Sequence, residues 1–129
     1  MGLAWIDVAA GRFEAAVVER HDVTDHLLRL DPAECLCAEK HRDLVADLVR
    51  SSGSRLVTPR PDWWFDAATA EAAVGRAVGG RRLEGLGFEL PADAPGIAAA
   101  GAVVAYLEQN EPAAIGRIDT LAAWRPGQR

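Results

Sequence analysis

Basic side chains are few and scattered in this 129-residue chain. Lys40 is the only lysine, and 14 Lys and Arg residues against 19 Asp and Glu residues give a formal net charge of -5. Binding to nucleic-acid phosphates needs a clustered basic surface, which this distribution does not predict. We therefore do not expect the chain to bind DNA autonomously.

Long apolar runs are missing as well. The most apolar segment, residues 97–107, is rich in alanine and glycine and is shorter than the roughly 20 residues that span a bilayer. The N-terminus has no basic stretch followed by a long apolar run, so no secretory signal is predicted. We expect a cytoplasmic protein without a membrane segment.

The chain has two cysteines, Cys35 and Cys37. On a strand both thiols would face the same side, but residues spaced in this way rarely form a disulfide. No second cysteine pair and no His-x-x-x-His motif accompanies them, so the pattern does not predict a zinc site. We expect buried, reduced thiols.

Common catalytic motifs are also missing from the sequence. No glycine-rich loop precedes Lys40, which is followed by His41, so the chain has no G-x-x-x-x-G-K-[ST] nucleotide-binding loop. No serine lies in a G-x-S-x-G motif, and the three histidines share neither a helix face nor a strand. The sequence predicts neither a hydrolase triad nor an ATPase site.

What the sequence does contain is the pattern of one α/β domain. Half of its residues are hydrophobic and 26% are charged, which is typical of a single globular domain of this length. Apolar runs and helical spacings predict strands at residues 3–8, 13–19, 34–38 and 56–58, and helices after Thr24 and at 41–50, 66–78 and 95–110. Strands that alternate with helices indicate a mixed α/β sheet with an N-terminal hairpin and helices against its faces.

Several residues are expected in the core of this domain. The small residues of the helix at 95–110 should allow it to approach the sheet closely. One of Trp63 and Trp64 should be buried and the other partly exposed. The irregular segment before the last long helix should be anchored by Leu83, Leu86, Phe88 and Leu90.

Asp7 raises the question of a metal site, because it ends the first predicted strand beside a turn. A nuclease site of the ribonuclease-H type needs three or four converging carboxylates around Mg²⁺. The first two helices offer Asp25, Asp43 and Asp47, but the last long helix carries alanine where an acid would be needed. A metal-dependent nuclease using Asp7 is therefore the alternative hypothesis, and an aspartate that accepts hydrogen bonds from its turn is the simpler one.

Five segments together resemble the second domain of MutS mismatch-repair proteins. GLAWIDVAAGRF is similar to GLAWLDLSTGEF, with which that domain begins. Similar segments follow in the family's order: DPAECLCAE, RPDWWFDAATAEAAV, LEGLGFE and AAAGAVVAYLEQNEPAAIGRI. The resemblance covers residues 2–118 of a single domain at 1–129, and it identifies the chain as either an excised MutS connector domain (domain II) or a shortened relative.

The resemblance implies a ribonuclease-H-like fold without catalysis. The implied function is to couple the mismatch-binding and ATPase domains of the parent protein and to offer a docking surface for MutL. No cofactor is expected in this domain, since ATP and Mg²⁺ bind the ATPase domain of the parent. The main dimer contacts of MutS lie elsewhere, so the isolated domain is expected to be a monomer.

The candidate docking surface is the outer face of the helix at residues 66–78. Its members are Glu71, Ala72, Gly75 and Arg76. These residues are small or singly charged, which leaves room for another protein to approach, although an ordinary solvated helix face has the same composition. A third hypothesis is DNA backbone contact in the intact parent, for which Arg60, Arg81 and Arg82 are the candidates.

Overall fold

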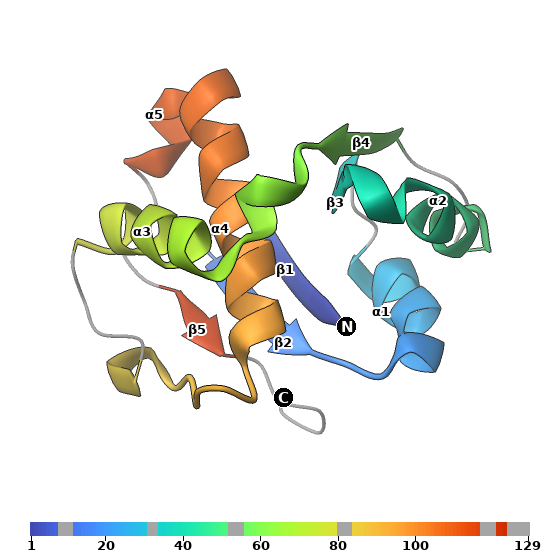
Figure 1. Cartoon of the computed structure of the whole chain (residues 1–129), viewed down its shortest axis with the longest axis horizontal. Helices are drawn as coiled ribbons and strands as arrows, with labels where there is room; N and C mark the ends of the chain where they lie inside the picture. Colours follow the sequence, from blue (N-terminus) through green and yellow to red (C-terminus); the bar gives the residue numbers. More distant parts are fainter. Residues whose placement is uncertain (8–11, 31–33, 52–55, 80–83, 117–120, 124–129) are drawn as a thin grey trace.

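The computed structural model describes residues 1–7, 12–30, 34–51, 56–79, 84–116 and 121–123 (Figure 1). The strands are β1 (Gly2–Asp7), β2 (Arg12–Val17), β3 (Glu34–Ala38), β4 (Leu56–Arg60) and β5 (Ala122–Ala123). The helices are α1 (Val23–Leu30), α2 (Arg42–Ser51), α3 (Ala67–Ala77), α4 (Ala94–Asn110) and α5 (Pro112–Ile115). The order of strands and helices that the sequence predicts is confirmed as far as α4.

The strands form two sheets in the described part of the chain, where the sequence suggested one. β1 and β2 pair antiparallel from Gly2 opposite Val17 to Asp7 opposite Arg12, and β5 pairs parallel with β2. β3 and β4 pair parallel in a separate sheet. Apolar spacing predicts where a strand lies but not which edge it pairs with, and this explains the difference.

Helices lie against both faces of the β1–β2 hairpin, because side chains alternate along each strand. Ala4 and Ile6 of β1, with Phe13 of β2, pack into the main core among α3 and α4. Leu3 and Trp5 face the other way, into a smaller cluster with residues of β2, α1 and α2. The expected mixed α/β arrangement with flanking helices is therefore present.

Helix α4 crosses the centre of the molecule between the hairpin and α3 (Figure 1). A Cβ added at Gly96 would lie 3.0 Å from the carbonyl oxygen of Ala16 in β2, which confirms the expected close approach to a sheet. Gly101 approaches α3 more closely still, since a Cβ added there would lie 2.4 Å from the Cα of Ala70. Within the described ranges, no helix has both the length and the apolar character that a membrane span requires.

For the residues that the structure describes, the core predictions hold with one exception. Trp64 is buried whereas Trp63 is 62% exposed, as expected for the pair. Phe88 is buried and Leu86 is partly buried, while Leu83 lies outside the described residues.

Leu90, however, is 47% exposed, and the prediction that it anchors the core is wrong. It follows Glu89, whose backbone N–H donates to Asp93 Oδ2 at 2.7 Å and whose carbonyl accepts from the N–H of Asp93. These two bonds close a turn around residues 90–92, and Leu90 lies on its exposed outside. The carboxylate of Asp93 is buried instead.

Candidate interaction surface on α3 and α4

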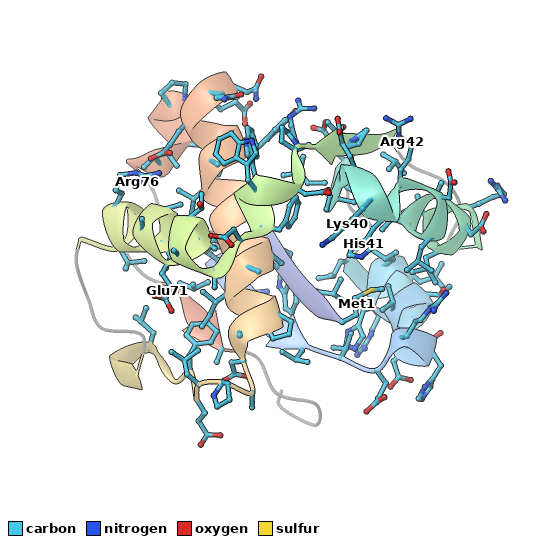
Figure 2. The ribbon with its side chains drawn as sticks, in the orientation of Figure 1. Met1, Lys40, His41, Arg42, Glu71 and Arg76 are labelled. Carbon is cyan, nitrogen blue, oxygen red and sulfur yellow. The ribbon has the colours of Figure 1, made fainter. Side chains whose placement is uncertain are left out.

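Helix α3 has one buried and one exposed face, as its sequence predicts. The buried residues are Ala70, Ala73, Val74 and Ala77. The outward residues are Glu71, Ala72 and Arg76, which are exposed, and Gly75, which is half-exposed. Figure 2 shows Glu71 and Arg76 at opposite edges of α3. Residues of a helix follow one another at about 100°, so Gly75 and Ala72 lie between these edges.

The two ends of this helix differ in their local chemistry. Asp66 occupies the N-cap position with an extended backbone, but its side chain makes no capping hydrogen bond. At the other end Gly79 has a φ of 69°, a left-handed conformation that glycine adopts without steric cost and that commonly ends helices. The helix is therefore stopped just after its last buried turn.

The middle of the exposed face is open. A Cβ added at Gly75 would meet no atom within 4 Å, and Ala72 contributes only a methyl group. A partner that approached here would immobilise few rotatable side-chain bonds, which lowers the entropic cost of association. The expectation of a small, lightly charged surface thus agrees with the geometry.

The charge of Arg76 is not free at this surface. Its Nε donates to Glu108 Oε2 and its Nη2 donates to Glu108 Oε1, both at 3.0 Å, in a two-pronged ion pair between α3 and α4. The hydrogen bond to this carboxylate raises the pKa of Arg76. Glu108 is not among the residues that the sequence predicts for this surface. Its partner is 32 residues away, and no local pattern links the two.

The candidate metal ligands are not brought together. Asp7 is exposed at the end of β1, opposite Arg12 in the register of the hairpin. Throughout the ranges that the structure describes, which include Asp25, Asp43 and Asp47, no group of three or more His, Cys, Asp or Glu side chains is placed to hold a metal ion.

The candidate DNA contacts are only partly described. Arg60 is half-buried, and its guanidinium carbon lies 5.9 Å from the ring centroid of Trp64 and 5.2 Å from that of Tyr106. Its Nη1 donates to the carbonyl of Pro59 at 2.9 Å. Arg60 is therefore engaged in packing within the domain. Arg81 and Arg82 lie outside the described residues.

The two cysteines lie on β3 and do not form a disulfide. Cys37 is buried, as expected, and Cys35 is half-buried. Burial raises the pKa of the Cys37 thiol above its ordinary value, with a smaller opposite effect from Arg42. A thiol with a raised pKa holds its proton at neutral pH and is a poor nucleophile.

Comparison with known proteins assigns the family. The family model for MutS domain II matches residues 1–119. The DNA mismatch repair protein MutS of Rhodopirellula baltica is 36% identical over 121 residues, which cover 94% of this chain and 13% of that protein. The protein of the same name from Chlorobium phaeovibrioides is 31% identical over 128 residues, or 98% of this chain and 14% of that protein. The chain thus spans about one seventh of these bacterial relatives and belongs to the MutS domain II family of DNA mismatch-repair proteins.

Proposed function

We propose that this chain is a non-catalytic connector module. In a MutS-type protein it would couple the mismatch-binding domain to the ATPase domain and offer a docking surface for MutL. The observation that carries this proposal is the family match over residues 1–119, nearly the whole chain. The proposal includes no cofactor in this domain, with ATP and Mg²⁺ bound by the ATPase domain of the parent protein.

The finer fold assignment, ribonuclease-H-like, is part of the same proposal. An N-terminal antiparallel hairpin, two further parallel strands and helices against both hairpin faces support it. Fold alone does not carry an activity with it. A ribonuclease-H-like scaffold that serves as a connector is therefore consistent with a chain that performs no reaction.

The docking surface that we propose comprises Glu71, Ala72, Gly75 and Arg76 of α3, with Glu108 of α4 beside Arg76. Its open middle would accept a side chain of the partner, and the ion pair at its edge would accept polar contacts. Interfaces of regulatory complexes commonly combine a small apolar centre with a polar rim.

The test measures MutL capture by an intact MutS-type protein that carries this domain, in the presence of ATP. Ala72→Arg and Gly75→Arg put a bulky charge in the open middle of the surface, and each should weaken capture at least tenfold. Asp43→Arg adds the same side chain on the exposed surface of α2 and should leave capture unchanged. Circular dichroism of each variant verifies that the fold is intact. Equal capture by all three variants would discard this surface.

The alternative, a metal-dependent nuclease that uses Asp7, makes a different prediction. Mg²⁺ or Mn²⁺ would bind beside Asp7, and Asp7→Asn would abolish both binding and cleavage. Calorimetric titration of the 129-residue chain with each cation, and a nicking assay on duplex DNA and on an RNA–DNA hybrid, separate the two functions. If the wild-type chain cleaves a substrate and Asp7→Asn does not, the nuclease function replaces the connector proposal.

A further inference from the structure

A polar cluster connects the β3–β4 sheet to α4. At the start of β3, Glu34 Oε1 accepts a hydrogen bond from the hydroxyl of Tyr106 at 2.8 Å. Its other carboxylate oxygen, Oε2, accepts a hydrogen bond from the hydroxyl of Thr58 on β4. Both oxygens of one half-buried carboxylate are therefore used, one within the sheet and one toward the helix.

The Tyr106 ring is held on its face as well as at its hydroxyl. The guanidinium carbon of Arg60 lies 5.2 Å from its ring centroid, within the range of a cation–π contact. Arg60 is the last residue of β4. We call Glu34, Thr58, Arg60 and Tyr106 the Tyr106 joint. Here one side chain of α4 is contacted by residues of both β3 and β4.

The joint matters because backbone pairing does not connect the two sheets in the described part of the chain. Helix α4 packs on α3, β1 and β2, and the β3–β4 sheet lies to one side of it together with α2 (Figure 1). Side-chain contacts must therefore hold the orientation of this sheet relative to α4. They include the apolar cluster around Trp5 and Leu48, the turn Asp62–Phe65 and the Tyr106 joint.

Tyr106 is also close in sequence to the docking surface. Glu108, which forms the ion pair with Arg76, follows Tyr106 by two residues on the same helix. Two residues of a helix are separated by about 200°, so these side chains leave α4 on opposite sides. Glu108 contacts Arg76 of α3, and Tyr106 contacts Glu34 of β3. A displacement of this turn of α4 would thus change the geometry of both the Arg76–Glu108 and the Glu34–Tyr106 contacts.

We infer that residues 106–108 of α4 act as a relay that couples the Arg76 edge of α3 to the β3–β4 sheet through the Tyr106 joint. The elements that respond are β3, β4 and α2, which can loosen while the core around α3 and α4 stays packed. The relay is a property of the domain by itself. It extends the proposed docking function by naming where a partner at Arg76 would have its effect, but it does not need that partner for its test.

The experiment is amide hydrogen exchange on the 129-residue chain. Tyr106→Phe removes only the donating hydroxyl, and Glu34→Gln removes the negative charge of the carboxylate that accepts this hydrogen bond. Each should speed exchange in β3 and β4 roughly tenfold or more, because a hydrogen bond to a charged group is lost, and should leave α3 and α4 unchanged. Val104→Ala, a cavity in the main core on the same helix, is the control and should speed exchange in every element.

A second variant tests the relay across α4. Arg76→Gln breaks the ion pair with Glu108 and should speed exchange in β3 and β4, with a smaller effect when Tyr106 is already phenylalanine. If Tyr106→Phe leaves β3 and β4 unchanged, or loosens all elements equally, the inference is overturned. An effect of Tyr106→Phe without any effect of Arg76→Gln overturns the relay as well. No MutL is used, so failure of the proposed docking surface is a separate result.

An optical readout verifies that the hydrogen bond is formed. Tyr106 is the only tyrosine of the chain. The hydrogen bond to the Glu34 carboxylate, together with burial, holds the pKa of Tyr106 above its ordinary value. Alkaline titration of tyrosinate absorbance should give a lower pKa in Glu34→Gln than in wild type. Equal pKa values would show that the joint is not formed, and would overturn the inference at its first step.

Discussion

A Cβ added at Gly101 of α4 would lie 2.4 Å from the Cα of Ala70 in α3 and 2.5 Å from its Cβ. The two helices therefore touch backbone to backbone at this point, and Ala70 itself is fully buried. This contact fixes how close α3 lies to α4, and with it the geometry that lets Arg76 reach Glu108.

Replacement of Gly101 by alanine should destabilise the fold. The added methyl group would overlap backbone atoms of α3, which cannot move aside alone, and overpacking of this kind costs about 1–3 kcal/mol or more. Gly75→Ala is the matched control on the neighbouring helix, where the space is open. It should stabilise the domain by about 0.5–1 kcal/mol because alanine favours helix interiors. Urea unfolding measures both, and a Gly101→Ala variant as stable as wild type would contradict the close contact.

The ion pair between Arg76 and Glu108 should contribute little stability despite its good geometry. The two side chains are 56% and 34% exposed, so water and salt screen their attraction. A double-mutant cycle with Arg76→Gln and Glu108→Gln should give a coupling free energy of about 0.2–1 kcal/mol. High salt should reduce it. Coupling that is larger and insensitive to salt would mean that the pair is desolvated.

Stability should depend on the protonation of His26 in α1. This residue is 8% exposed, and its Nδ1 lies 3.2 Å from Nη2 of Arg29. Arginine can only donate, so the ring accepts and is neutral. Burial, with a further effect from Arg29, lowers the pKa of His26, while Asp22 and Asp25 act in the opposite direction.

The sign of the pH effect follows from linkage. Below the ordinary value of 6.5 the unfolded chain binds more protons at this site than the folded chain does. The contribution of His26 to the free energy of unfolding is therefore complete above that pH. It is lost as the pH falls toward the lowered pKa of His26 in the folded state. Urea midpoints at a series of pH values should decline less steeply in His26→Gln than in wild type. An equally steep decline in His26→Gln and in wild type would contradict the prediction.

Trp63 and Trp64 should differ in how much stability is lost when each is replaced by alanine. Trp64 is 4% exposed, and Trp63 is 62% exposed. Trp64→Ala should cost about 3–5 kcal/mol, as for other large side chains removed from a core. Trp63→Ala should stay within about 0.5 kcal/mol. Thermal unfolding followed by circular dichroism compares them, and similar losses for both would contradict the burial of Trp64 alone.

Much of the fold could be predicted because local patterns report local structure. The apolar spacing at residues 66–78 predicted α3 to within one residue at each end, and the outward position of Arg76 followed from the same period. The run from Leu3 predicted β1. Leu90 was misassigned because its hydrophobic character does not reveal that it lies outside a turn.

The sequence by itself determined the strands and helices, the two faces of α3 and the family, since a period of two or 3.6 residues and a series of ordered motifs can be read along the chain. Only the tertiary structure decided which edges pair and which charges meet. Arg76 and Glu108 are 32 residues apart, and Glu34 and Tyr106 are 72 residues apart. Such contacts depend on how closely α4 can approach α3 and the strands, which is set by packing in three dimensions and by no local spacing.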